Sequence, residues 1–463
     1  MNSTTAAPST LSEPNLKQRF KRAASWTLLS YGATQVLRLA SNLVLARWLA
    51  PEMFGVMAIA NLAIVALVML SDVGLGAGAI RSPRGDDPTF LNVTWVVQIV
   101  RGGVIALATL AIAAGLSLAG HAGWLPAHSV YADPMVPKVI AMLSVLGLVM
   151  GLESTKVWSQ RRGLELAQLT KIELGCQVAT TLFILSWAAI APSVWALAGG
   201  WIFGATLKTV MTHLALPGAP NRLQWDRPAF NEIMAFGKWT LVSSPLTFLL
   251  NNGDRLLLAS FLDSRAMGFY SIAFMLVNAL HAAVGRLVSD AALPALSEVF
   301  RDRPDELKSA LYRIRRPLDI GCFVAAGALA MLGQPVVDLL YDHRYASAGW
   351  MLSVLALTLL ATPSGLFDQC LIAMGLPSKQ SLLNAVRLVA LYALVPLGFM
   401  LAGIEGAVAA VAVCALVNLA TNLGLQHQMG LLDARRELRG LPLFAAGLLA
   451  GGALRLALGG WPR

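Results

Sequence analysis

The chain alternates between long apolar runs and short polar segments. No charged residue occurs in Met53–Leu70, Gly102–Gly120, Val178–Phe203 or Leu388–Ile404. A helix needs about 20 apolar residues to cross roughly 30 Å of hydrocarbon, and these runs approach or exceed that length. The pattern predicts thirteen hydrophobic helical segments, over residues 23–49, 53–72, 91–119, 136–156, 170–191, 193–214, 237–261, 266–288, 317–340, 347–373, 380–401, 404–427 and 440–459.

The composition places these helices in a membrane rather than in a soluble core. Residues are 57% hydrophobic and 13% charged, whereas soluble domains carry about 25% charged residues. We therefore expect an all-α integral membrane protein with about 12–14 transmembrane helices. The net charge of +10 is spread over helix ends along the chain, so we expect no nucleic-acid partner. The four cysteines and six histidines show no metal-ligand spacing, so neither a metal nor a cofactor is expected.

The loop charges predict an orientation. Most Lys and Arg residues fall on one set of alternating loops if the N-terminus is cytoplasmic, as positive-inside insertion requires. The longest loop on the other side, His121–Pro134, contains no Lys or Arg. The polar and basic N-terminal segment does not resemble a cleavable signal. One inner loop contains an amphipathic stretch, Pro304–Arg316, which is expected to form a solvated surface helix between two spans.

The two halves of the chain are similar to each other. At an offset of 213 residues, Trp26 aligns with Trp239 and Gly55 with Gly268, without a gap between these pairs. The copies begin six spans apart, so they have the same orientation and form a parallel repeat, as in many secondary transporters. The predicted division is 1–22 (cytoplasmic basic tail), 23–215 (N-lobe), 216–236 (cytoplasmic linker), 237–427 (C-lobe) and 428–463 (cytoplasmic loop and C-terminal span).

Several ionisable or strongly polar side chains lie inside the apolar segments. Each ionisable side chain costs about 2.5–3.5 kcal/mol or more in hydrocarbon, so such residues usually face a partner or a cavity. The arginines are Arg38, Arg101, Arg255 and Arg387, the amides are Asn42, Asn251 and Asn252, and the acids are Asp254, Glu153, Glu173 and Asp368.

Two interpretations of these residues remain open. In the first, the arginines pair with the acids and hold helices together. In the second, the arginines line a water-filled cavity and bind an anion, because guanidinium groups match phosphate oxygens in a bidentate arrangement. The acids then either couple transport to a proton or sodium ion or position the arginines. Gly32 and Pro245 occupy matched positions in the two leading helices and mark either hinges or static kinks.

Three segments, taken in their order along the chain, resemble the sequence pattern of a known family. They are Asn252–Leu262 (NGDRLLLASFL), Met267–Ala273 (MGFYSIA) and Leu293–Ser297 (LPALS), with Leu45–Gly55 (LARWLAPEMFG) as the N-terminal counterpart. This order and spacing resemble bacterial polysaccharide flippases, the Wzx-type, colanic-acid-exporter-like members of the MOP superfamily. The resemblance covers about residues 18–427.

The resemblance implies a two-lobed, alternating-access protein in the bacterial inner membrane, with a MATE-like pair of six-helix lobes. It would carry undecaprenyl-pyrophosphate-linked oligosaccharide between leaflets, with membrane lipid and a polysaccharide polymerase as partners. It implies no enzymatic activity.

Other functions remain as alternatives. One is a different MOP transporter, either a peptidoglycan-precursor flippase or an ion-coupled multidrug exporter. Another is a membrane glycosyltransferase or polymerase, which the short outer loops disfavour.

Overall fold

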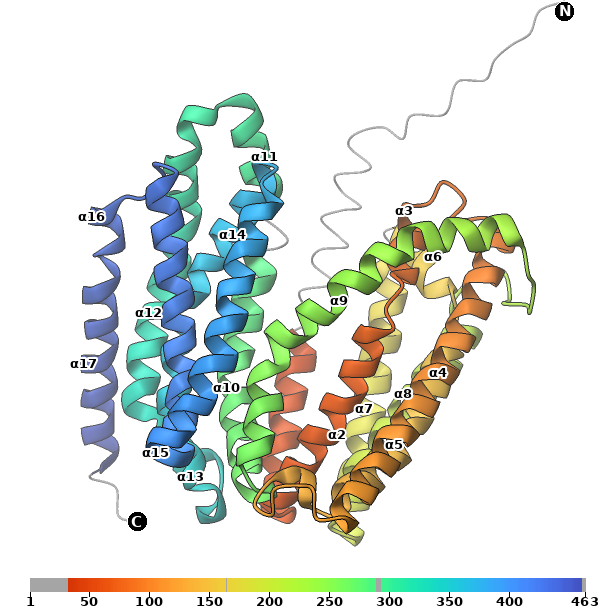
Figure 1. Ribbon diagram of the computed structural model, residues 1–463, viewed down its shortest axis with the longest axis horizontal. Helices are drawn as coiled ribbons and strands as arrows, with labels where there is room; N and C mark the ends of the chain where they lie inside the picture. Colours follow the sequence, from red (N-terminus) through yellow and green to blue (C-terminus); the bar gives the residue numbers. More distant parts are fainter. Residues whose placement is uncertain (1–31, 164, 289–292, 460–463) are drawn as a thin grey trace, which may run out of the picture. The chain divides into compact units, whose positions relative to one another are not determined.

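The computed structural model describes residues 32–163, 165–288 and 293–459, and this part of the chain is helical without any strand (Figure 1). A first helix is described over residues 32–48. The following elements are α2 (Pro51–Leu70), α3 (Leu75–Arg81), α4 (Pro88–His121), η1 (Val130–Ala132), α5 (Met135–Gly151), α6 (Lys156–Arg162), α7 (Leu166–Ile190), α8 (Val194–Leu214), α9 (Arg227–Phe261), α10 (Ser264–Leu287), α11 (Leu293–Asp302), η3 (Pro304–Glu306), α12 (Leu307–Leu340), η4 (His343–Tyr345), α13 (Ser347–Leu355), η5 (Ala356–Ser364), α14 (Gly365–Ala373), α15 (Pro377–Gln428), α16 (Ala434–Glu437) and α17 (Gly440–Gly459).

The all-α membrane architecture expected from the apolar runs is confirmed. Nine helices in the described ranges are long and apolar enough to cross a membrane, or up to eleven if two bent helix pairs each count as one span. The helix α15 is in fact two helices, because Ala402 and Gly403 have non-helical backbone angles. That break falls between two predicted segments. The predicted basic tail and the start of the first predicted segment lie outside the described residues.

The chain forms two compact units that are not contiguous in sequence. Unit 1 comprises residues 1–44, 67–110 and 142–244, and unit 2 comprises 45–66, 111–141 and 245–463. The boundaries between the units fall inside several long helices, so each of these helices contributes residues to both units. The lobe boundaries drawn from the sequence repeat stay a prediction.

In unit 1, side chains from neighbouring helices bind the carbonyl groups at helix ends. The Gln98 amide donates to three carbonyls at and just beyond the end of α5, at 2.9–3.2 Å. Arg162 donates to the last turn of α3, and Lys156 donates to two carbonyls at the end of α8, at 2.9 and 3.1 Å. Terminal carbonyls have no partner within their own helix. These contacts satisfy them and place donors, two of them cationic, where the helix dipole favours positive charge.

In unit 2, the two copies of the repeat cross at glycine residues. A methyl group on Gly55 would collide with the carbonyl of Ser264, and one on Gly268 would collide with the carbonyl of Pro51. Gly55 and Gly268 are repeat equivalents, and so are Pro51 and Ser264. The contact is therefore reciprocal, as in an interface between two-fold related copies. Only glycine permits this approach of α2 and α10.

A turn after α12 binds the end of the first helix within the same unit. The Arg344 guanidinium donates to the carbonyl of Ala46 at 3.0 Å and forms an ion pair with Asp342 at 2.6 Å. Partial burial works to raise the pKa of Asp342, but the hydrogen bonds from Arg344 outweigh it and hold that pKa below its usual value. The Tyr345 hydroxyl donates to the carbonyl of Leu49 at 3.0 Å. The turn thus fixes the segment that precedes the glycine crossing.

The amphipathic stretch Pro304–Arg316 is not a separate surface helix, and that expectation is wrong. Most of it continues directly into the membrane helix α12. Arg315 is 3% exposed and binds Glu437 through two hydrogen bonds of 2.5 and 2.9 Å, with Asp319 at 3.1 Å. The stretch is amphipathic because its polar face carries these buried charged groups. Buried charges are tolerated only when each has a partner.

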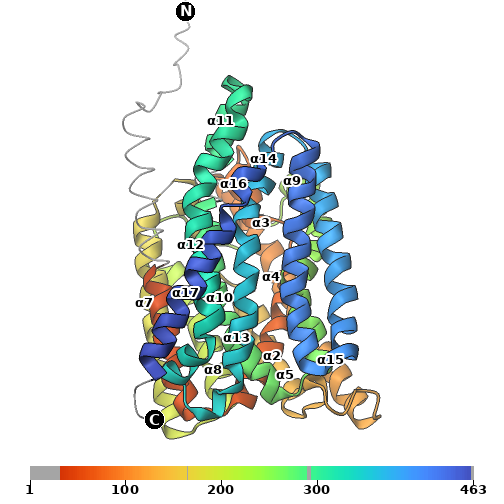
Figure 2. The ribbon, with the colours of Figure 1, turned by 90° about the vertical axis from the view of Figure 1, so that its left-hand side faces the viewer.

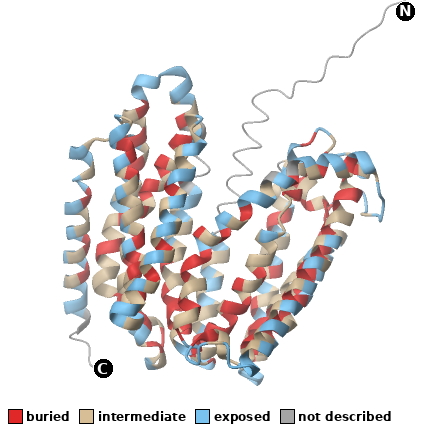
Figure 3. Cartoon of the chain, in the orientation of Figure 1, coloured by how far each residue is buried: buried red, intermediate tan, exposed pale blue. Residues whose placement is uncertain are grey.

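The last helix, α17, lies along α12 (Figures 1 and 2). Methyl groups on Gly447 or Gly327 would collide with the backbone of the facing helix, and one on Gly451 would lie 2.8 Å from the carbonyl of Ala328. Exposed positions run along much of α17 (Figure 3). The C-terminal segment is thus a span-length helix, docked through small residues.

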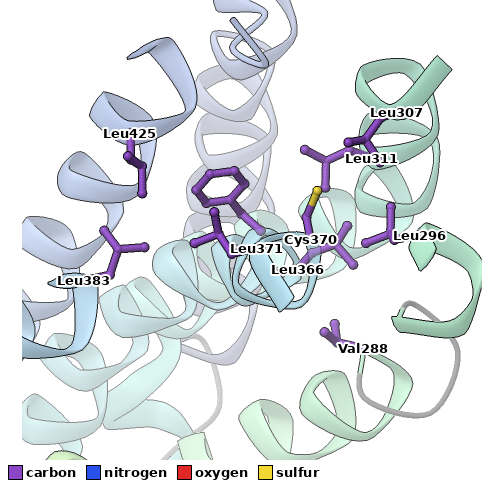
Figure 4. Packing of buried hydrophobic residues seen from close by; sticks show 10 residues of the cluster. Val288, Leu296, Leu307, Leu311, Leu366, Cys370, Leu371, Leu383 and Leu425 are labelled. Carbon is purple, nitrogen blue, oxygen red and sulfur yellow. The ribbon is translucent and has the colours of Figure 1, made fainter. Parts of the chain in front are cut away.

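A hydrophobic cluster joins α11, α12, α14 and α15 in unit 2 (Figure 4). Leu296, Leu311, Cys370 and Leu383 each contribute from one of these helices. All four cysteines are buried, where a thiol acts as a small apolar side chain.

Gly268→Ala is expected to destabilise the protein by about 1–3 kcal/mol, because the methyl group overpacks a backbone contact. The matched control is Gly285→Ala in the same helix, where a methyl group meets nothing within 4 Å. That control should be neutral or gain up to about 1 kcal/mol from helix propensity. Thermal unfolding of purified protein in detergent measures both. Equal behaviour of the two variants would contradict the close crossing.

Gly447→Ala is expected to loosen α17 from α12, whereas Gly452→Ala is not, since its methyl group meets only the end of the Met331 side chain, at 3.8 Å. Limited proteolysis between α15 and α17, compared for the two variants, reports the docking directly. Faster cleavage of Gly447→Ala alone is the expected result, and cleavage at the wild-type rate speaks against docking through this glycine.

Candidate functional site

Unit 2 contains a cavity of about 510 Å³ between its helices. Its walls come from α9, α10, η5, α14 and α15. Six residues predicted from the sequence line it, namely Asn251, Asn252, Asp254, Arg255, Asp368 and Arg387. The structure therefore brings together predicted residues that are more than 130 positions apart in the chain.

Helix α9 supplies the first charged pair. Asn251, Asp254 and Arg255 follow helical spacing, which places them on one face. The Asp254 carboxyl is buried and accepts a hydrogen bond from the Tyr270 hydroxyl at 2.6 Å. The Arg255 guanidinium lies over the Phe274 ring, 4.1 Å from its centroid. This cation–π contact stabilises the charge, but the buried Arg255 Nε has no hydrogen-bond partner among the described residues.

The tenth predicted span is interrupted where it meets the cavity. It consists of α13, the 3-10 helix η5 and α14, and η5 covers nine residues and contains Pro363. Runs of 3-10 helix longer than three or four residues are uncommon, and within a longer helix they often mark functional positions. Thr358, Thr362 and Ser364 from η5 line the cavity.

His281 connects α10 to the interrupted span. Its Nε2 lies 2.9 Å from the Thr358 hydroxyl and its Nδ1 lies 2.8 Å from the Thr362 hydroxyl. Thr358 already donates to the carbonyl of Leu355 at 2.6 Å, so Nε2–H must donate to Thr358. The Thr362 hydroxyl can then donate to Nδ1. A neutral imidazole satisfies every partner in this arrangement.

Asp368 and Arg387 face the same cavity without a direct partner. Among the described residues, neither forms a hydrogen bond or an ion pair within 4.0 Å, and the Asp368 Oδ1 atom is buried. The charged side chains that line the cavity are two arginines and two aspartates. With a neutral His281, the cavity has no formal net charge.

The other predicted residues lie outside this cavity. Arg101 binds the end of α2, donating to the carbonyl of Val68 at 2.6 Å and lying 3.9 Å from Asp72. The remaining pairs join Glu153 to Lys208 at 2.8 Å and Glu173 to Arg161 at 3.6 Å. Among the described residues, no predicted acid forms an ion pair within 4.0 Å with a predicted arginine, and both interpretations of these residues stay predictions.

Two predicted polar residues belong to the first helix. Arg38 is exposed, and its guanidinium makes no hydrogen bond or ion pair with any described residue. Asn42, one turn further on, is half-buried.

The two candidate hinge residues, Gly32 and Pro245, lie in different surroundings. A methyl group on Gly32 would meet nothing within 4 Å, and Pro245 directly follows the boundary between the two units. Their role as hinges stays a prediction.

The sequence interpretation missed His281, Thr358 and Thr362. The sequence did contain a signal for the two threonines. Thr358 and Thr362 are four residues apart, which is about one helical turn, within an apolar span, and a proline follows them. Within the described ranges, no group of three or more His, Cys, Asp or Glu side chains could hold a metal ion.

Comparison with known proteins relates the chain to polysaccharide synthesis. A family model described as "Polysaccharide biosynthesis protein" matches residues 44–349. The teichuronic acid biosynthesis protein TuaB of Bacillus subtilis (strain 168) is 20% identical over 376 residues, which are 76% of this chain and 71% of the relative.

Two solved structures have a similar fold. The lipid II flippase MurJ in an inward closed conformation has a TM-score of 0.69 at 11% identity, over 95% of this chain and 93% of MurJ. An inward-facing multidrug-resistance MATE family transporter of the MOP superfamily has a TM-score of 0.67 at 12% identity, over 86% and 94% of the two chains. At these identities the likeness establishes the fold.

Tyr270→Phe is expected to destabilise the protein by about 1–3 kcal/mol, because it leaves the buried Asp254 carboxyl short of a hydrogen bond. Tyr392→Phe is the matched control, since the buried Tyr392 hydroxyl has no hydrogen-bond partner in the part of the chain that the structure describes. Thermal unfolding in detergent should show a lower midpoint for the first variant and an unchanged or higher midpoint for the second. The reverse order would refute the hydrogen bond as a stabilising contact.

Proposed function

Because the chain belongs to the polysaccharide biosynthesis protein family and has the fold of MOP superfamily transporters, we propose that it flips undecaprenyl-pyrophosphate-linked oligosaccharide across the bacterial inner membrane. The repeat units would serve O-antigen, capsule or exopolysaccharide synthesis. Transport would proceed by alternating access, with the lipid tail remaining in the bilayer. The observation that carries the proposal is a polar cavity with four charged side chains inside a bundle of apolar, span-length helices.

The physical problem of the proposed substrate matches this architecture. A glycan and a diphosphate cannot cross hydrocarbon unaided, because each polar group would lose its water without gaining a partner. Charged side chains at depth are equally costly unless they face water or a ligand. The four charged side chains that line the cavity therefore support a polar substrate. Arg38 is exposed and forms no ion pair with a described residue, so it is available to a phosphate oxygen.

The cavity charge distinguishes this proposal from a multidrug cation exporter. A site for organic cations should carry excess acid, whereas this cavity contains as many arginines as aspartates. A lipid-precursor flippase for peptidoglycan remains the second candidate, because its substrate is also a diphosphate-linked glycan and the fold likeness to MurJ extends over 95% of this chain. Coupling to protons or sodium ions and a polysaccharide polymerase partner are part of the proposal.

Deleting the gene should trap lipid-linked repeat units on the inner leaflet, and Arg38→Ala should reduce export about tenfold or more, because one charge-assisted contact contributes about 1.5–3 kcal/mol. Arg255→Ala should also reduce export. The control is Val36→Ala, an exposed position on the helix that carries Arg38. Surface polysaccharide and membrane insertion are measured together. Normal polysaccharide in both arginine variants would contradict their assignment, and normal polysaccharide in the deletion strain would contradict the function.

A further inference from the structure

We propose that the cavity of unit 2 is a subsite for an uncharged sugar ring of the glycan and does not bind its diphosphate. The inference rests on the proposed function, which supplies a lipid-linked glycan as substrate, and it assigns one part of that substrate to this cavity. It also revises the role of Arg255 and Arg387, for which the sequence predicted anion binding.

The charge balance of the cavity opposes either kind of ion. A diphosphate would find Arg255 and Arg387 but would also face the carboxyl groups of Asp254 and Asp368. A cation would face the same conflict with the arginines. A hydroxyl group both donates and accepts hydrogen bonds, so a neutral polyhydroxy compound can satisfy arginine and aspartate together.

The cavity offers unused donors and acceptors of both kinds. Within the described part of the chain, the buried Arg255 Nε is a donor without a hydrogen-bond partner, and the buried Asp368 Oδ1 is an acceptor without one. Arg387 contributes further donors, and the Asn278 amide on the cavity wall provides one group of each kind and makes no hydrogen bond to another described residue. Buried groups in this state cost free energy unless water or a ligand binds them.

The size of the cavity suits a sugar better than a bare ion. Its volume of about 510 Å³ lies within the range of about 300–1,000 Å³ for small-molecule sites. One water molecule occupies only about 30 Å³ of liquid, so a monovalent ion would leave most of the space to solvent. His281 does not change the charge balance, because its contacts with Thr358 and Thr362 are all satisfied by the neutral imidazole.

The test compares two lipids on the purified protein in lipid nanodiscs. One is undecaprenyl pyrophosphate, and the other is the lipid-linked repeat unit extracted from the source strain after deletion of this gene. Asp368→Asn and Arg387→Gln should each weaken binding of the glycosylated lipid about tenfold and leave binding of the bare lipid unchanged.

The charge-changing variants distinguish a sugar from a diphosphate in the cavity, because the two ligands predict different changes in lipid binding. If the diphosphate occupied the cavity, Asp368→Asn would remove a repelling charge and strengthen binding of both lipids, and Arg387→Gln would weaken both. Either result overturns the inference, and so does a wild-type protein that binds both lipids equally. Lys379→Gln is the matched control, because it makes the same charge change on α15 outside the cavity wall.

Failure of the proposed function would look different. A wild-type protein that binds neither lipid contradicts lipid-linked glycan as the substrate. Asp368→Asn changes side-chain size little, and Arg387 is an exposed residue of α15, so a folding defect in one variant leaves the other as the test.

Discussion

The structure depends on one constraint, which is that polar backbone groups in an apolar surrounding must be bonded within the protein. At helix ends the constraint is met by donors from neighbouring helices, such as Gln98 at the end of α5 and Lys156 at the end of α8. Where helices cross without such donors, glycine lets backbones come close enough to exclude voids, as at Gly55 and Gly447. Dispersion contacts then replace the hydrophobic driving force that lipid does not provide.

The same constraint explains what the sequence could predict. A span must be apolar over its length, so hydrophobic runs locate the spans and even the break at Ala402 and Gly403 inside α15. The repeat was visible in the sequence from the matches at Trp26 and Gly55. In the structure, Gly55 and its equivalent Gly268 lie at one helix crossing. The stretch Pro304–Arg316 was misassigned, since amphipathicity alone does not tell a surface helix from a span extension whose polar face binds a buried acid.

The charged residues that line the cavity are among those predicted from the sequence, but the sequence did not predict which partners the other charged residues bind. Charged residues at depth are rare, so the sequence identified both arginines and both aspartates of the cavity. Their partners depend on how each helix is rotated about its axis, which sequence spacing within one helix does not determine. Glu153 therefore pairs with Lys208, and Arg101 with the end of α2, and neither pair was expected. Thr358 and Thr362 are uncharged and carry a weaker signal.

The repeat register separates the roles of two arginines. At the offset of 213 residues, Arg38 corresponds to Asn251, and Asn42 corresponds to Arg255. The arginines are thus four residues apart in the register, about 6 Å of helical rise. Asp254 corresponds to Ser41, so only the second copy provides a carboxyl group next to its arginine. In its described part, the leading helix of the first repeat therefore has an arginine without an acidic neighbour in the sequence, whereas that of the second has a balanced pair. The two copies of the repeat thus supply different chemistry in their leading helices.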